Sequence, residues 1–117
     1  TLKEEIFGPV LTVYVFPDVQ FDEITMKLAD SSSYALTGSI FSQDREVIVR
    51  VSEMLRHAAG NFYINDKSTG AVVGQQAFGG GRQSGTNDKA GSALNLIRWV
   101  SPRTIKETFL PLAHYTY

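Results

Sequence analysis

Residues 35–65, ALTGSIFSQDREVIVRVSEMLRHAAGNFYIN, place a helix-like pattern between two short strand-like runs. The run at 35–42 and the run at 61–65 contain the β-branched and aromatic residues that favour strands. A strand, a helix and a strand in this order predict parallel strands joined by a crossover helix. The sequence therefore predicts a fold of the α/β class.

The helix between these two strands has recognisable signals at both ends. Asp44 is a residue type that caps helix N-termini, and Gly60 is a residue type that follows helix C-termini as C′. We therefore expect a helix from Asp44 to Ala59. Its apolar residues recur at helical spacing: Val47, Ile48, Val51, Leu55 and Ala58.

Further elements are predicted on either side of this unit. Residues 9–16 are apolar at nearly every position, which is typical of a strand covered on both faces. Residues 21–30 have helical spacing with acids in the first turn. Residues 89–100 are expected to be helical, and 103–112 to form a terminal strand. We expect one domain over residues 1–117, with the α/β core and a long loop within 1–100.

Composition excludes several classes of function. The chain has 117 residues, a net charge of −1 and no cysteine. Nothing drives it electrostatically toward nucleic acid or an anionic membrane, and it cannot form a disulfide, a thiolate metal site or a cysteine nucleophile. The sequence contains no run of about 18 apolar residues, so no membrane span is predicted. TLKEEIFGPV, the first stretch, has no readable targeting signal and starts like the middle of a longer chain.

The stretch from 60 to 91 holds eight of the ten glycines. It is too long for an ordinary connection, and such loops are usually functional. A dinucleotide-binding G-x-G-x-x-G beginning at Gly79 would need glycine where Ser84 stands, and no Walker motif is present. We expect the glycines to bring backbone N–H groups close to a ligand, a suitable way to hold a carboxylate.

Other polar residues give no catalytic constellation. Glu4 and Glu5 are adjacent, so their side chains should point in opposite directions rather than form an acid pair. His57 and His114 have no neighbouring His, Asp or Glu cluster, and both are expected to be structural or exposed. No group of residues has metal-ligand spacing, so no metal site is predicted. Trp99 is expected in the core or at an interface.

Two stretches resemble a known family. KEEIFGPVL, at 3–11, is similar to a signature of the aldehyde dehydrogenase superfamily. Residues 60–91 resemble the branch of that family that oxidises L-glutamate γ-semialdehyde to L-glutamate with NAD in proline breakdown. The resemblance covers the whole chain but only about the last fifth of such an enzyme. It implies the C-terminal part of the catalytic domain, with parallel strands, crossover helices and a terminal oligomerisation strand.

The resemblance also assigns a cofactor site. In the family, a cysteine thiolate attacks the aldehyde and a glutamate activates water, and both lie N-terminal to the EEIFGPV segment. The 117 residues alone are therefore expected to be inactive and to contribute binding groups. Glu5 matches the carboxylate that binds the nicotinamide ribose hydroxyls of NAD. Phe7 matches the aromatic ring beside the nicotinamide.

The glycine-rich stretch matches the loop that anchors the aldehyde substrate. By the resemblance, the backbone N–H groups of Gly70 and Ala71 bind the α-carboxylate of glutamate semialdehyde. Phe78 packs against its aliphatic chain. Some relatives have Ser at position 71, and many have Pro where this chain has Ala77, so the effect of these two alanines on substrate affinity stays open.

Two alternatives remain. The chain could belong to an aldehyde dehydrogenase with another substrate, or it could be a short non-catalytic form that only associates with full-length subunits. Kinetics on several aldehydes would test the first alternative, and the length of the encoded chain would separate the second from a fragment of a complete enzyme. By the resemblance, the strand at 103–112 adds to a partner subunit's sheet, giving a homodimer or larger homo-oligomer. The implied compartment is the mitochondrial matrix, or the cytoplasm if the protein is bacterial.

Overall fold

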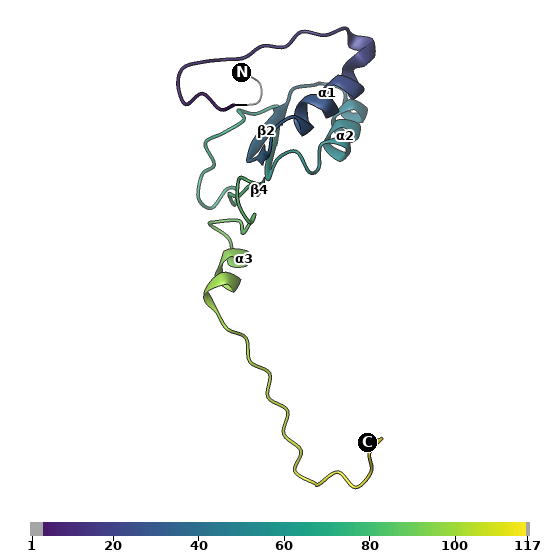
Figure 1. The fold of residues 1–117 in the computed structure, drawn as a ribbon, viewed down its shortest axis with the longest axis vertical. Coiled ribbons are helices and arrows are strands. Elements are labelled where there is room, and N and C mark those ends of the chain that lie inside the picture. The colour runs from purple at the N-terminus through teal and green to yellow at the C-terminus, as the bar shows by residue number, and fades with distance from the viewer. Residues whose placement is uncertain (1–3, 117) are drawn as a thin grey trace.

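A pair of parallel strands with a helix between them in the chain forms the centre of the computed structural model (Figure 1). The structure describes residues 4–116, so Lys3 of the 3–11 signature lies outside it. Strand β2 (Thr37–Ile40) pairs with β3 (Asn61–Ile64) in a register that runs from Thr37 opposite Asn61 to Ile40 opposite Ile64. The α/β class predicted from the sequence is confirmed.

Helix α2 (Arg45–Met54) begins where the sequence predicts. The Asp44 side chain accepts hydrogen bonds from the backbone N–H groups of Glu46 at 2.9 Å and Val47 at 3.3 Å. These bonds satisfy two of the donors that the first helical turn leaves without partners. The predicted N-cap is therefore confirmed.

The predicted end of α2 is wrong. The helix stops at Met54, and residues 55–58 form turns instead of a last helical turn. Leu55 leaves the helical region with φ −100° and ψ 14°, and the Ala58 N–H bonds only three residues back, to the Leu55 carbonyl at 2.8 Å, so the α-helical bonding pattern ends here. Gly60 consequently does not follow the helix as C′.

Gly60 instead lies against Gly79 and Gly80, further along the glycine-rich stretch. A Cβ atom on Gly60 would stand 2.0 Å from the Gly79 carbonyl oxygen and 2.7 Å from the Gly80 Cα, so the two backbones touch where no side chain would fit. Glycine is needed here for close approach of two chain segments.

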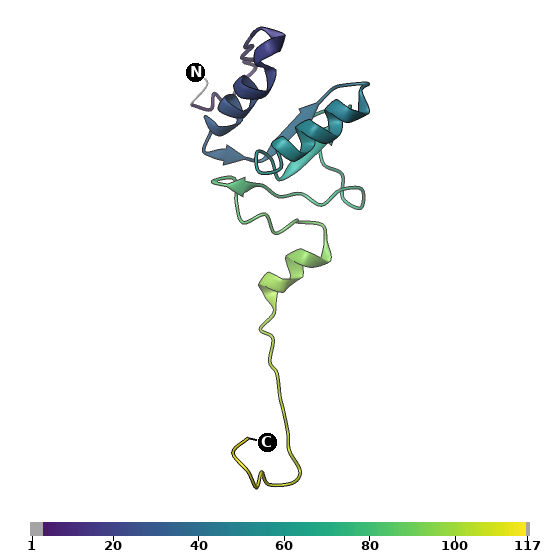
Figure 2. The same cartoon turned by 90° about the vertical axis from the view of Figure 1, so that its right-hand side faces the viewer.

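Helix α1 (Phe21–Asp30) has the bounds predicted from the sequence and follows a 3-10 turn, η1 (Asp18–Gln20). It lies beside α2 in both views (Figures 1 and 2). An ion pair between Asp22 and Arg50 joins the two helices. The described apolar core is small: Ala35, Ile48, Val51, Leu55 and Tyr63.

The strand predicted at 35–42 is divided between two sheets. Strand β1 (Tyr34–Ala35) pairs antiparallel with β4 (Gly81–Arg82), while β2 belongs to the parallel pair. The Arg82 guanidinium supports the pairing of β4 with β1 by donating to the carbonyls of Ala29 and Ser32, each at 2.9 Å. The glycine-rich stretch thus returns to the body through β4.

The strand predicted at 9–16 is not formed. These residues join no β-ladder within 4–116, and most of their side chains are exposed. A strand needs a neighbouring edge to satisfy its N–H and C=O groups, and both two-stranded sheets leave this segment outside their pairings. The apolar composition of 9–16 favours burial, but no other segment within 4–116 covers most of its side chains.

The helix predicted at 89–100 is shorter in the structure: α3 (Ala93–Leu96) continues into the 3-10 turn η2 (Ile97–Trp99). It begins only after residue 91, because Lys89 and Gly91 have φ angles of 56° and 85°, which a right-handed helix cannot include. Trp99 is 79% exposed, so it does not lie in a core within this chain.

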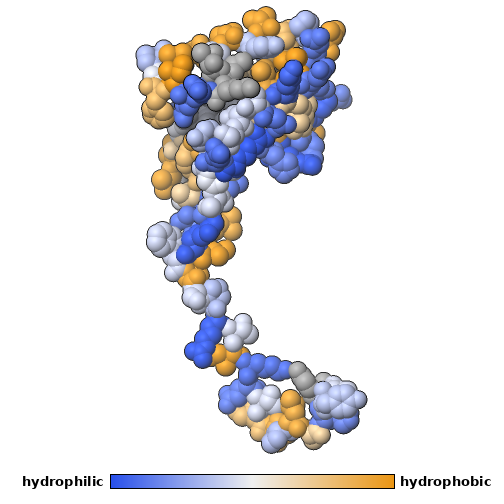
Figure 3. Space-filling view, viewed as in Figure 1, coloured by the Kyte–Doolittle hydropathy of each residue, from blue (hydrophilic) through white to orange (hydrophobic). Residues whose placement is uncertain are grey.

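Residues beyond η2 extend away from the body (Figure 1), and Figure 3 shows hydrophilic and hydrophobic side chains interspersed along them. The radius of gyration is 21.6 Å, against about 13 Å for a compact domain of this length. The segment 103–112 joins no ladder among the described residues. Its role as a strand in a partner's sheet therefore stays a prediction. Between Glu4 and Thr116, no helix has the length and apolar character needed to cross a bilayer.

The contact at Gly60 yields a prediction on stability. We expect Gly60→Ala to lower the free energy of unfolding by about 1–3 kcal/mol or more, because the methyl group forces two backbones apart. Gly81→Ala is the matched control, since nothing lies within 4 Å of a Cβ at that position. Thermal unfolding measures both, and equal losses for the two variants would contradict the close contact.

Candidate functional site

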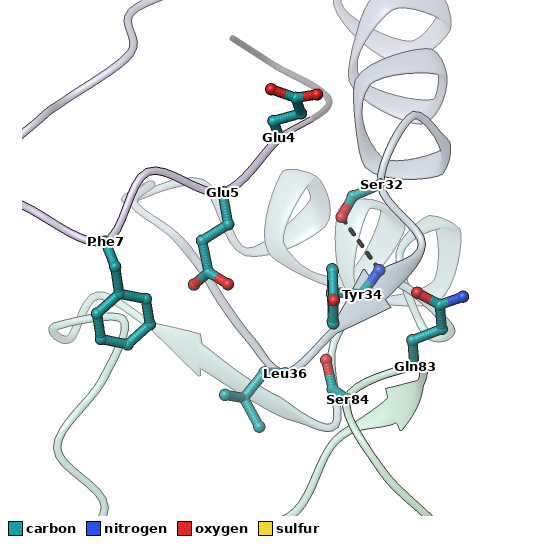
Figure 4. A pocket seen from close by; sticks show the side chains of 8 residues that line it. All are labelled: Glu4, Glu5, Phe7, Ser32, Tyr34, Leu36, Gln83 and Ser84. Atoms are coloured by element: carbon teal, nitrogen blue, oxygen red, sulfur yellow. Dashed lines mark hydrogen bonds between the residues drawn. The ribbon is translucent and has the colours of Figure 1, made fainter.

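A cavity of about 510 Å³ opens between the N-terminal segment and β1 (Figure 4). Glu5 and Phe7, the two residues expected to bind a cofactor, both line it. Its lining residues come from three parts of the chain: Glu4, Glu5, Phe7, Ser32, Tyr34, Leu36, Gln83 and Ser84. The fold thus brings the N-terminal signature next to the end of the glycine-rich stretch.

Hydrogen bonds hold the wall opposite Glu5. The Ser84 hydroxyl accepts from the Ala35 N–H at 2.9 Å, and the Gln83 N–H donates to the Ser33 carbonyl at 3.0 Å. The Ser32 hydroxyl accepts from the Tyr34 N–H at 3.1 Å, which is the dashed line in Figure 4. This wall is therefore fixed by contacts between segments about fifty positions apart in the chain.

The cavity carries negative charge and an accessible ring. Its lining includes two carboxylates and neither Lys nor Arg. Glu5 has no hydrogen-bond donor or cation beside it within residues 4–116, and Phe7 is 97% exposed. A carboxylate without a partner accepts well from hydroxyl groups and repels phosphate. The cavity is thus suited to a hydroxyl-bearing, flat group rather than to an anion.

The acid pair behaves as the sequence predicts. Figure 4 shows the carboxylates of Glu4 and Glu5 pointing in opposite directions from the extended segment. Only the Glu5 side chain extends toward Phe7 and Leu36, so the two acids do not form a catalytic dyad in this structure.

The residues expected to bind the substrate lie elsewhere in the glycine-rich stretch. Gly70 has a φ of 80°, and neither its N–H nor that of Ala71 donates to a protein acceptor within residues 4–116. The Lys67 Nζ would lie 3.4 Å from a Cβ on Gly70, so a cation stands beside these two donors. Sequence reasoning missed Lys67, although a lysine three residues before the expected anchor was a readable signal.

Phe78, the third of these residues, is held through its backbone. Its N–H and carbonyl both bond to Ala90, at 2.9 and 2.8 Å, while its side chain is 36% exposed. Gly70, Ala71 and Phe78 do not line the cavity that contains Glu5. The structure therefore separates the expected cofactor residues from the expected substrate residues.

The remaining candidates form no site. His57 lies in the turns after α2, and His114 stacks on Tyr115 with ring centroids 4.8 Å apart. Within the part of the chain that the structure describes, no group of three or more His, Cys, Asp or Glu could hold a metal.

Comparison with known proteins gives consistent similarities. The sequence model of the family described as "Aldehyde dehydrogenase family" matches residues 1–105. A curated relative from Dictyostelium discoideum, named mitochondrial delta-1-pyrroline-5-carboxylate dehydrogenase, is 65% identical over 100% of this chain and 21% of its own length.

Solved structures agree on the fold. A Mycobacterium tuberculosis delta-pyrroline-5-carboxylate dehydrogenase bound with NAD is 54% identical, with a TM-score of 0.72 over 97% of this chain and 21% of that chain. A Staphylococcus aureus betaine aldehyde dehydrogenase reaches a TM-score of 0.76 over the same shares at 32% identity. The chain thus spans about a fifth of the length of the proteins it matches, and the backbone alone does not separate two substrate classes.

Asp88, near the end of the glycine-rich stretch, makes an acid-sensitive contact with Arg98 of η2. The Thr86 hydroxyl and the Arg98 guanidinium, the latter at 2.9 Å, donate to Asp88 and hold the pKa of its carboxyl below the ordinary value. A lowered folded pKa stabilises the fold above the unfolded pKa of about 3.9, and this contribution is lost as pH falls through the folded pKa.

We expect the backbone amides of η2 to exchange hydrogen faster, relative to their intrinsic rates, as pH falls from about 3.9 through the folded pKa of Asp88. In Asp88→Asn the extra acid sensitivity should disappear, and an unchanged pH response would contradict the contact.

Proposed function

Because this chain belongs to the aldehyde dehydrogenase family, we propose that it is part of an NAD-dependent enzyme that oxidises L-glutamate γ-semialdehyde to L-glutamate in proline catabolism. The observation that carries this proposal is the 65% identity, over the whole chain, to a relative named delta-1-pyrroline-5-carboxylate dehydrogenase. The matched region spans the glycine-rich stretch, which provides the candidate substrate anchor.

The cavity beside Glu5 fits the nicotinamide end of NAD. Its carboxylate has no protein partner within residues 4–116 and can accept from the two vicinal hydroxyls of a ribose. The exposed Phe7 ring offers a flat apolar face to the nicotinamide. When bound, NAD supplies the acceptor for the hydride that leaves the aldehyde carbon. The part of Glu5 and Phe7 is to orient that acceptor.

The Gly70 region fits the carboxylate end of the substrate. Two N–H donors without protein acceptors and a neighbouring Lys67 ammonium together favour an anion. Ala71 contributes its N–H but has no hydroxyl, so one side-chain bond available to a serine is absent. Phe78 provides the apolar surface for the methylene groups of the substrate.

The chemical step needs groups outside these 117 residues. The chain has no cysteine, and the family's thiolate nucleophile and glutamate base precede the Glu5 segment. We therefore propose that the 117 residues alone oxidise no aldehyde. The mitochondrial matrix and strand exchange through 103–112 belong to the same proposal, supported by the relatives' names and by the exposed apolar tail.

Substrate class is testable in a chimera in which these 117 residues replace the matched segment of the Dictyostelium discoideum relative. Glutamate semialdehyde carries a carboxylate, whereas betaine aldehyde carries a quaternary ammonium. We expect kcat/KM to favour glutamate semialdehyde by at least about a hundredfold, because Lys67 and the free N–H groups select an anion. A preference for betaine aldehyde would overturn the proposed substrate.

Replacing Glu5 tests the cofactor site. In the chimera, Glu5→Gln should slow hydride transfer and raise the NAD concentration required, because a neutral amide accepts from ribose hydroxyls less strongly than a carboxylate. Single-turnover NADH formation and NAD titration measure the two effects. Wild-type values for both would show that Glu5 does not bind the cofactor.

Replacing Gly70 tests the substrate anchor. Gly70→Asp places a negative side chain beside the substrate carboxylate, in a φ region that favours glycine. We expect KM for glutamate semialdehyde to rise by more than about tenfold, since a charge-assisted hydrogen bond contributes about 1.5–3 kcal/mol.

An uncharged aliphatic aldehyde is the control for this variant. Its KM should change far less, because it has no carboxylate to bind. Equal losses for the two aldehydes would mean that the loop is misfolded, and unchanged kinetics for both would exclude Gly70 from the anchor.

A further inference from the structure

The Asn61 side chain connects β3 to both residues that flank Phe78. Asn61 is the one buried polar residue between Glu4 and Thr116, with 7% of its surface exposed. Its Nδ2 donates to the Ala77 carbonyl at 2.9 Å, and its Oδ1 accepts from the Gly79 N–H at 3.0 Å. One carboxamide therefore fixes the backbone immediately before and after Phe78.

This bridge requires the chemistry of an amide. Ala77 presents an acceptor and Gly79 presents a donor, so the side chain between them must donate and accept at once. An aspartate could only accept when ionised, and an apolar residue could do neither. Each buried polar group left without a partner would then be destabilising.

Neighbouring contacts complete the support on the same side. Gly60 lets its backbone touch Gly79, and the Lys89 ammonium donates to the carbonyls of Gly60 and Gly79, the latter at 3.2 Å. Phe78 itself bonds only to Ala90 through its backbone. Since glycines follow Phe78 and Ala77 does not restrict φ as a proline would, the local sequence does little to fix the backbone at Phe78.

We propose that Asn61 is a positioning residue for substrate binding: by bridging Ala77 and Gly79, its carboxamide sets where the Phe78 ring meets the aliphatic chain of the aldehyde. This inference rests on the proposed function. Asn61 does not contact the substrate and acts through Phe78 alone.

A double-mutant cycle in the full-length chimera tests this role. Asn61→Leu keeps the branching and the number of heavy atoms but removes both hydrogen bonds, and Phe78→Ala removes the ring. We expect Asn61→Leu to raise KM for glutamate semialdehyde by about tenfold with kcat nearly unchanged. In the Phe78→Ala background the same change should add less than about twofold, because residues that act as one unit are not additive.

Val51→Ala provides a control for lost stability, because Val51 is fully buried and belongs to α2, outside the glycine-rich stretch and the Asn61 bridge. It should lower the unfolding temperature while leaving KM unchanged. If Asn61→Leu does not fold, Asn61→Ser, whose single shorter hydroxyl replaces the carboxamide, takes its place in the cycle.

The outcomes separate the inference from the proposed function. The positioning role alone would be overturned if the KM increase in the double mutant equals the product of the two single-mutant increases. It would also be overturned if Asn61→Leu leaves KM unchanged while Phe78→Ala raises it. An unchanged KM in Phe78→Ala would overturn the substrate contact in the proposed function, and the inference with it. A KM increase in Val51→Ala equal to that in Asn61→Leu would reduce Asn61 to a structural role.

Discussion

The close contact of Gly60, just before β3, with Gly79 and Gly80 holds the backbone beside Phe78 against the body of the fold. Two backbones meet at Gly60 and Gly79 with no room for a Cβ. A long glycine-rich segment loses more conformational entropy on ordering than most sequences, so contacts must compensate for it. The bonds from Asn61 and Lys89 supply that compensation at the point of contact.

The glycine-rich stretch contributes to two separate regions, one on each side of its contact with Gly60. On one side, the segment containing Gly70 and Phe78 presents N–H donors and an aromatic ring. On the other side, β4 returns the chain to β1, and Gln83 and Ser84 become the wall of the cavity that contains Glu5. In the proposed function, one segment thereby contributes to both the cofactor region and the aldehyde region.

Local signals in the sequence predicted local structure well. The spacing and acids of 21–30 gave both bounds of α1, and Asp44 located the start of α2, because caps and amphipathic periodicity act within a turn or two. The end of α2 was missed because Gly60, read as a local C′ residue, serves a long-range contact. Residues 9–16 have strand composition, but a strand also requires a partner edge, which composition does not reveal. In the site, the family resemblance led to Glu5 and Phe7, which share a cavity, whereas the bridge made by Asn61 depends on residues 16 and 18 positions away.

A structure of the full-length chimera with NAD and the product L-glutamate bound would test the central claim most directly. We expect the product's α-carboxylate to accept hydrogen bonds from the Gly70 and Ala71 N–H groups, with Phe78 on its methylene groups and Glu5 on the nicotinamide ribose hydroxyls. A carboxylate bound away from residues 70 and 71, or a ribose that does not reach Glu5, would contradict the assignment of both ends of the site.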